Sequence, residues 1–147
     1  MRQSFKTVAI ASILLIFFVI SYLKNPYRAS NLDIIVTVVP KNGNSENMKE
    51  LLQGILDDFK DYFQSVLKGK IKHEYNIIFY GLSVELNNDA LLQAKLSDVV
   101  NKDVDTEDFD TVKEGLTEIL TNLRKKDIRK NEIIIDVSED LDVSTST

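Results

Sequence analysis

The chain is predicted to fold as an α+β domain in the order β-α-β-β-α-β, preceded by a hydrophobic N-terminal helix. Three observations predict this class. Short runs rich in β-branched residues recur along the chain, two longer segments place apolar residues every three or four positions, and turn residues separate these segments. A length of 147 residues allows one ordinary domain.

The first strand and the first helix are expected in the opening part of this domain. β-branched residues dominate Asp33 to Val39, and Pro40 then ends the strand. A helix is expected over about 46–68, with Ser45 as its N-cap and Gly69 as its C-cap. Its apolar stripe consists of Met48, Leu52, Ile55, Phe59, Phe63 and Val66.

Two strands and a short helix are expected next. Lys70 to Phe79 is predicted as the second strand and Leu82 to Leu86 as the third, with Gly81 at the join. Ala90 to Val100 has the apolar spacing of a short helix, and an acidic loop follows over 101–110.

The last helix and the last strand complete the pattern. Thr111 to Glu114 has the form of a capping box, which predicts that the helix begins there. Glu132 to Ser138 is predicted as the terminal strand. Two helices on one face of a four-stranded antiparallel sheet form the ferredoxin-like arrangement, with the first and third strands central and the other face open for binding. The helix that begins at Thr111 is expected to place five apolar side chains inward: Val112, Leu116, Ile119, Leu120 and Leu123.

Residues 1–29 differ from the rest of the chain. Arg2 and Lys6 precede an uncharged run from Thr7 to Leu23, and basic residues follow it. This pattern predicts either a cleaved signal peptide or a retained signal anchor, and the sequence leaves both open. We therefore expect entry into the secretory pathway, ending in the vacuole or the endoplasmic reticulum lumen. A retained segment would tie the domain, residues 30–147, to a membrane.

Composition disfavours several classes of function. The chain has no cysteine and one histidine, His73, so thiolate chemistry and a cysteine-built metal site are excluded. We expect no enzyme, no catalytic residue, no metal and no cofactor. After Ser30 the net charge is about −9, because four of the 18 basic residues precede it and all 23 acidic residues follow. Such a charge argues against a nucleic-acid partner.

Some residues have two interpretations each. The basic run from Arg124 to Lys130 either complements a helix C-terminus and solvates a turn or binds an acidic partner. His73 is either a surface or hairpin-packing residue or a base, and the first is favoured. The acidic residues 57–61 and 98–110 lack calcium-loop spacing, which favours a solvated face over a cation site. Core packing is favoured over a ligand platform for Phe59, Phe63, Tyr75 and Phe79.

The C-terminal stretch is the most informative part of the chain. Four β-branched residues, Ile133, Ile134, Ile135 and Val137, favour a buried strand, and a polar, acidic end follows directly. Such an end is either a frayed terminus or an extended segment that inserts into the groove of another protein.

Two stretches carry a family resemblance. His73, Glu74 and Tyr75, followed by an aliphatic run and Gly81, resemble the middle of the subtilisin-propeptide family and, more specifically, the fungal proteinase B inhibitors. The closing stretch 135–143 resembles that family's last strand and acidic tail. Together with the first strand, the resemblance covers roughly residues 32 to 147.

This resemblance implies a stand-alone inhibitor, or a folding chaperone acting in trans, of a subtilisin-like serine protease. The open sheet face would dock on two surface helices of the protease, and the tail would lie in the active-site groove like a product. Asp140 would cap a protease helix, Val143 would fill the S4 pocket and Ser146 would occupy S1. The tail, 139–147, contributes the binding residues Asp140, Leu141, Asp142, Val143, Ser144, Thr145, Ser146 and Thr147.

The chain departs from the family pattern at several points. Phe79 and Tyr80 place two residues before Gly81 where the family has one, which predicts a bulge in the hairpin. The family's second capping acid falls on Ser138, which is uncharged, and Thr147 extends the tail. About 88–106 is an insertion. These departures keep an alternative open, a membrane-associated interaction module without inhibitory activity that takes part in vacuole organisation.

Overall fold

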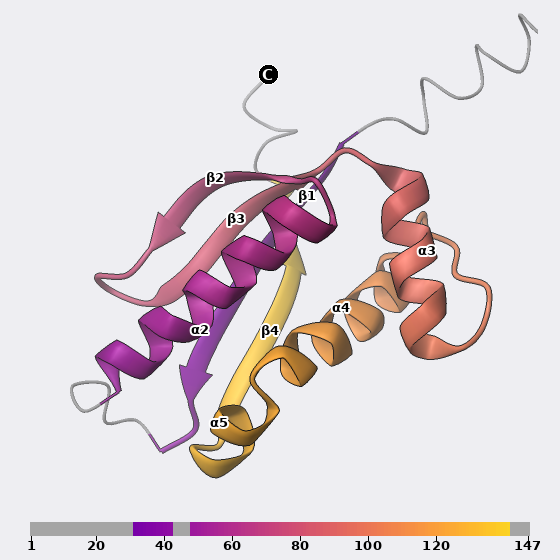
Figure 1. Ribbon diagram of the computed structural model, residues 1–147. Coiled ribbons are helices and arrows are strands. Elements are labelled where there is room, and N and C mark those ends of the chain that lie inside the picture. The colour runs from indigo at the N-terminus through magenta and orange to yellow at the C-terminus, as the bar shows by residue number, and fades with distance from the viewer. Residues whose placement is uncertain (1–30, 43–47, 142–147) are drawn as a thin grey trace, which may run out of the picture. The chain divides into compact units, whose positions relative to one another are not determined.

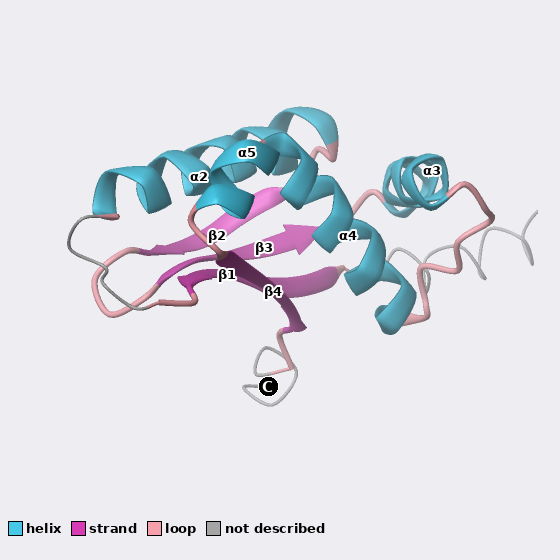
Figure 2. Cartoon of the chain, turned by 90° about the horizontal axis from the view of Figure 1, so that it is seen from below, coloured by secondary structure: helices cyan, strands magenta, loops and turns pink. Residues whose placement is uncertain are grey.

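The domain consists of one antiparallel sheet with helices packed on one of its faces (Figure 1, Figure 2). This computed structural model describes residues 31–42 and 48–141. The chain divides into two units, residues 1–30 and 31–147, so every described residue belongs to the second. The predicted hydrophobic helix lies outside the described residues. No helix within 31–42 and 48–141 combines the length and apolarity that a membrane span requires.

The sheet contains four strands in the order β2-β3-β1-β4. They are β1 (Leu32–Pro40), β2 (Lys70–Tyr75), β3 (Tyr80–Leu86) and β4 (Ile133–Glu139). Every neighbouring pair is antiparallel. The predicted α+β class with a four-stranded antiparallel sheet is therefore confirmed.

The first helical segment is shorter than predicted and ends differently. It comprises α2 (Lys49–Asp61) and the π-helical turn η1 (Tyr62–Val66). Gly69 is not the C-cap, because Lys68 takes the left-handed conformation with φ 56°. Gly69 instead directly precedes β2, and a Cβ on it would lie 2.9 Å from the carbonyl oxygen of Glu85. Glycine is needed there because β3 approaches closely. The predicted N-cap, Ser45, lies outside the described residues.

The other helices are α3 (Asp89–Val100), α4 (Phe109–Leu123) and α5 (Lys125–Lys130). The predicted capping box is wrong, because α4 begins two residues before Thr111, with Asp108 at the N-cap. The Thr111 hydroxyl donates a hydrogen bond to the Asp108 carboxylate at 2.9 Å. Leu123 was expected to face inward but is 39% exposed.

The hairpin between β2 and β3 corrects a second prediction. The expected strand Lys70 to Phe79 is too long, because β2 ends at Tyr75 and β3 already begins at Tyr80. Gly81 lies inside β3 and pairs with Thr37 of β1. The register shift falls in β2, between Ile71 and His73, and not before Gly81. The hydrophobic run 77–79 is consequently a loop at the tip of the hairpin.

The core lies between the sheet and the helices. The predicted insertion, about 88–106, belongs to it, since Leu92, Leu96 and Val104 are buried. Gly115 of α4 lets Leu96 approach, because a Cβ there would lie 2.6 Å from Leu96 Cδ2. Residues 31–147 thus contain a complete core of their own, as an independently folding domain requires. The buried side chains come from Ile34, Val36, Val38, Leu52, Ile55, Leu56, Phe59, Phe63, Leu67, Leu82, Val84, Leu86, Leu92, Leu96, Val104, Val112, Leu116, Leu120, Ile128, Ile133 and Val137.

The terminal strand β4 forms close to its predicted position and pairs with β1 over its whole length. Its side chains alternate between the two faces of the sheet. Ile133 and Val137 are buried, but Ile134 is 51% exposed. The expectation that all four β-branched residues are buried is therefore wrong, because a strand with helices on one face buries every second side chain.

Candidate protein-binding surface

The face of the sheet opposite the helices is a broad surface, which we call the open face (Figure 2). The strand register defines it. Ile35 on β1 lies between Ser83 on β3 and Ser138 on β4. The neighbouring row places Thr37 between Gly81 and Asp136. Ile35 and Thr37 are thus partly exposed between small residues, of which Ser83 is buried.

One end of the open face is acidic. Asp33 of β1 pairs with Glu85 of β3. The Asp140 backbone N–H donates a hydrogen bond to the Asp33 carbonyl oxygen at 2.8 Å, which places Asp140 opposite Asp33 in the same register. Lys72 Nζ lies 3.3 Å from the Asp33 carboxylate, and Asn31 donates to the Glu85 carboxylate at 2.8 Å. The predicted capping residue Asp140 therefore leaves the sheet at this acidic end.

A second carboxylate lies on the same strand, four residues before Asp140. Asp136 accepts a hydrogen bond from the Ser138 hydroxyl at 2.7 Å. Lys113 of α4 contacts the same carboxylate, with Nζ 3.5 Å from Oδ1. Sequence reasoning stressed the missing charge at Ser138 and overlooked Asp136. The period of two along a strand could have indicated that residues 136, 138 and 140 share one face.

The predicted protease-binding tail is described only at its start. Leu141 is 62% exposed. Asp142, Val143, Ser144, Thr145, Ser146 and Thr147 lie outside the described residues.

Of the four residues that carry the family resemblance, His73, Tyr75 and Gly81 lie together on the open side of the sheet, and Glu74 points away from them. His73 is exposed on the open face, and its ring centroid lies 6.2 Å from that of Tyr75. Glu74 points to the helix side, where its carboxylate is 2.7 Å from Lys60 Nζ. A Cβ at Gly81 would lie 2.8 Å from the Val36 carbonyl oxygen. Close packing in the sheet and hairpin thus accounts for glycine at this position.

The other end of the open face is apolar. Tyr75 and Phe79 stack, with ring centroids 4.9 Å apart and planes at 26°. The Phe79 ring also covers Gly81. Val39 pairs with Ile134, and both are about half exposed. The prediction of core packing therefore holds for Phe59 and Phe63, which are buried, and is wrong for Tyr75 and Phe79.

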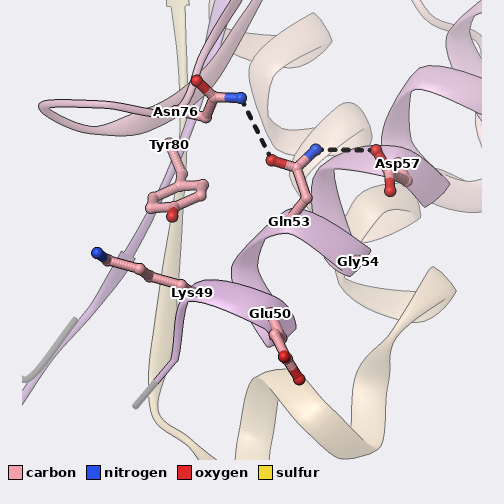
Figure 3. Close-up of a pocket in the computed structure, with 7 residues that line it drawn as sticks. All are labelled: Lys49, Glu50, Gln53, Gly54, Asp57, Asn76 and Tyr80. Carbon is pink, nitrogen blue, oxygen red and sulfur yellow. Dashed lines mark hydrogen bonds between the residues drawn. The ribbon is translucent and has the colours of Figure 1, made fainter. Parts of the chain in front are cut away.

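A polar groove of about 560 Å³ lies between α2 and the hairpin (Figure 3). Asn76 donates to the Gln53 side-chain oxygen at 3.5 Å, and Gln53 donates to Asp57 at 3.0 Å. The Gln53 bond lowers the pKa of Asp57, and the Glu74 bond raises the pKa of Lys60. These bonds join α2 to the hairpin, so we assign the groove a structural role. Its lining residues are Lys49, Glu50, Gln53, Gly54, Asp57, Asn76 and Tyr80.

The basic cluster forms α5 and not the solvated turn that the sequence predicts. Arg124 lies between α2 and α5, 2.8 Å from Asp58 and 2.9 Å from Asp127. Its guanidinium passes over Gly54, where a Cβ would lie 3.4 Å away. The bond to Asp58 raises the pKa of Arg124.

The predicted absence of a cation site concerns the acidic stretches. Within residues 31–42 and 48–141, no three or more Asp, Glu or His side chains come together in a group that could hold a metal ion.

Comparison with known protein families, curated proteins and solved structures gives no match to this chain. The function is therefore inferred from the chemistry of the open face and of its two ends.

Proposed function

We propose that this protein inhibits a subtilisin-like serine protease of the secretory or vacuolar pathway, or assists its folding in trans. The position of β4 carries the proposal. It is the last described strand, lies at the edge of the sheet and ends next to Asp140, at the acidic end of the open face. A tail in that position can enter a groove while the open face rests on the surface beside it.

The strand order supports this proposal. In the order β2-β3-β1-β4, the first and third strands are central and the last strand lies beside the first. We propose that the domain is ferredoxin-like, as the family resemblance implies. The helices occupy one face, and the opposite face carries the small side chains of Ser83, Thr37 and Ser138. Small side chains along these rows leave room for two packed helices of a protease.

Carboxylates on β4 provide the charge complementarity. Helix N-termini present free N–H groups and a partial positive charge, so they bind anionic side chains. We assign Asp140 to one protease helix and Asp136, with its bound Ser138 hydroxyl, to the neighbouring one. Asp136 would thereby compensate for the missing acid at Ser138.

The tail would act as a product-like peptide. Its main chain would pair with the edges of the protease groove, which gives affinity, while side chains in pockets give specificity. Val143 would fill S4 and Ser146 would occupy S1, with Thr147 extending one residue further. The chain itself would supply no catalytic residue, metal or cofactor.

A second candidate is the membrane-associated module without inhibitory activity, which takes part in vacuole organisation. The uncharged Ser138 and the additional Thr147 favour it, since both weaken the match to an inhibitory tail. In this case residues 7–23, if retained, would hold the domain at the membrane. Protection of a C-terminal tag from added protease in intact microsomes would test the luminal location that both candidates share.

Deletion of Val143 to Thr147 tests the leading proposal. We expect residues 31–147 to inhibit a vacuolar-type subtilisin and residues 31–142 to have lost inhibition. The melting temperature should be nearly equal in both, because the deleted residues follow the last strand of the sheet. Equal inhibition by the two proteins would show that the tail is not the reactive element.

A further inference from the structure

The tip of the β2–β3 hairpin exposes large apolar side chains to solvent. Ile77 is 93% exposed and Ile78 is 95% exposed, the highest values among the large hydrophobic residues of 31–42 and 48–141. Phe79 and the stacked Tyr75 continue this surface onto the open face. We call residues 75–79 the apolar tip. Adjacent, almost fully exposed isoleucines indicate a contact surface, because single exposed apolar residues are common but grouped ones are not.

The apolar tip is held in place by the rest of the domain. The Asn76 amide donates to Gln53 on α2 (Figure 3), and the Phe79 ring packs over Gly81. The Tyr75–Phe79 stack closes the base of the loop. A positioned loop loses less conformational freedom on binding than a free one. The tip is thus preorganised to present the two isoleucines outward.

Basic residues accompany the apolar tip at the same end of the sheet. The antiparallel register brings together the end of β1, the start of β4 and the hairpin tip, and α5 directly precedes β4 (Figure 1). Arg124 is bound to two aspartates, but the other basic residues of α5 are exposed. Lys41 and Lys49 lie at this end too. The exposed basic residues of α5 are Lys125, Lys126, Arg129 and Lys130.

Acidic residues at this end are fewer and partly engaged. The Glu132 carboxylate accepts a hydrogen bond from Asn42 at 3.2 Å, and Asp127 is bound to Arg124. Glu50 lies in the first turn of α2. The acidic group of Asp33, Glu85 and Asp140 lies at the opposite end of the sheet. Lys72 is paired with Asp33 there, and Lys70 lies opposite Glu85, so that end carries charges of both signs. At the end with the apolar tip, the exposed basic residues outnumber the acidic ones.

We propose that the apolar tip and α5 together bind the surface of an anionic phospholipid bilayer. Ile77 and Ile78 would enter the boundary between headgroups and acyl chains, and Tyr75 would lie at headgroup level. The lysines of α5 would contact anionic headgroups across the width of the sheet, about 14 Å between its outer strands. Charge complementarity favours a bilayer over a protein pocket, because a pocket for the tip would leave α5 without a partner.

This inference concerns a second site, separate from the proposed protease site. The tail leaves the sheet at the acidic end, whereas the apolar tip and α5 lie at the other. A bilayer would attract the basic end, so the end of the sheet at Asp33 and Asp140 would point away from the membrane. Bilayer binding and protease binding are therefore compatible in one molecule.

Vesicle flotation with residues 31–147 tests the inference. Phosphatidylcholine vesicles in which about 30% of the lipid is anionic phosphatidylserine should bind the domain at low salt. Vesicles of phosphatidylcholine alone should bind it weakly. Ile77→Ser/Ile78→Ser should lower binding at least about tenfold. Ile77→Leu/Ile78→Leu should retain it. Because both isoleucines are almost fully exposed, the melting temperature should not change.

Two variants that each remove two positive charges form a matched pair. Lys125→Gln/Lys126→Gln should lower binding about tenfold and reduce its salt dependence. Lys95→Gln/Lys102→Gln, which changes exposed lysines of α3 and the loop after it, should bind as the unchanged domain does.

Insertion of the tip can be followed with a fluorescent label, since the chain contains no cysteine. A polarity-sensitive dye on Ile78→Cys should shift to the blue with anionic vesicles, and the same dye on Ala94→Cys should not. Equal vesicle binding by all variants, or an unshifted dye at residue 78, would overturn the inference. Loss of protease affinity or of self-association in Ile77→Ser/Ile78→Ser, with vesicle binding unchanged, would overturn it in favour of a protein contact. None of these outcomes alters the tail-deletion result that tests the proposed protease site.

Discussion

The two faces of the sheet differ although the same strands form both. On β1 the side chains of Ile34, Val36 and Val38 are buried under the helices, while Ile35 and Thr37 lie between them on the open face. The buried face is entirely aliphatic along this strand, whereas the open face alternates aliphatic and polar groups. One face therefore carries the stability of the domain and the other is free to take part in binding. Substitutions one residue apart should separate the two properties.

The largest expected effect is in the core between the buried face and the helices, to which Phe63 of η1 belongs. Phe63→Ala should lower the free energy of unfolding by about 3–5 kcal/mol, because Phe63 is fully buried and its removal leaves a cavity. Thr37→Ala on the open face should change it by less than about 0.5 kcal/mol. Chemical denaturation measures both. Similar losses in the two variants would show that the faces do not divide stability and binding in this way.

A smaller loss is expected where α3 packs on α4. Gly115→Ala should have a net cost of up to about 2 kcal/mol, because the new Cβ would lie 2.6 Å from Leu96 Cδ2, and alanine's higher helix propensity offsets about 1 kcal/mol of that overpacking. Leu96→Ala creates space at that point, so Gly115→Ala should cost much less in its presence. A double-mutant cycle measures this coupling. Additive costs would indicate that α3 does not press on Gly115.

On the open face the expected effect is on affinity. Asp140→Asn should weaken protease inhibition by a few-fold to roughly thirtyfold, because a carboxylate at a helix N-terminus contributes about 0.3–2 kcal/mol. Ser138→Glu should tighten the complex, and Ser138→Gln is its uncharged control. Both charge effects should shrink with added salt. An unchanged inhibition constant for Ser138→Glu at low salt would contradict the assignment of β4 to the protease helices.

The smallest effect concerns pH and the link between α2 and the hairpin. The hydrogen bond to Glu74 raises the pKa of Lys60 above its ordinary value. The ion pair therefore stabilises the folded state fully at any pH below that ordinary value. It is lost as the pH rises through the higher folded-state pKa. The Lys60–Glu74 ion pair should contribute about 0.2–1 kcal/mol to the free energy of unfolding, as other partly exposed ion pairs do. In Lys60→Met, thermal unfolding should show a weaker fall of stability above about pH 10. An unchanged alkaline profile would exclude this contribution.

On the acid side, Asp57 should act in the opposite sense. The hydrogen bond from Gln53 lowers the pKa of Asp57. This bond therefore stabilises the folded state above the ordinary pKa of Asp57, and the stabilisation is lost as the pH falls through the lowered pKa of the folded state. Gln53→Leu should flatten the acid limb of the same unfolding profile.

Much of the fold could be predicted because hydrophobic periodicity reports burial. β1, β4 and the apolar stripes of α2 and α4 follow from it directly. The hairpin could not, since Ile77, Ile78 and Phe79 have the composition of a strand and the loop contains no glycine or proline. The sequence predicts Gly81 as a turn residue, but it lies inside β3, where a Cβ would be 2.8 Å from the Val36 carbonyl oxygen.

The candidate surface was predictable in part. The residues of β4 and the tail are visible in the sequence, because a strand that runs into a polar end has a distinct composition. The ion pair of Lys72 with Asp33 joins residues 39 positions apart, and Arg124 reaches Asp58 across 66. Such contacts depend on the tertiary arrangement. α5 and the apolar tip lie at the same end of the sheet because of the strand order, which the sequence does not reveal directly.

The most direct test of the central claim compares the accessibility of the two sides of the domain in the protease complex. The chain has no cysteine, so Thr37→Cys can report on the open face and Glu118→Cys on the exposed side of α4. We predict that a subtilisin-like protease inactivated by replacement of its catalytic serine, with its groove open, slows alkylation of Thr37→Cys by about tenfold or more and leaves Glu118→Cys unchanged. Equal alkylation rates at Thr37→Cys with and without the protease, at saturating concentration, would contradict the claim that the open face binds it.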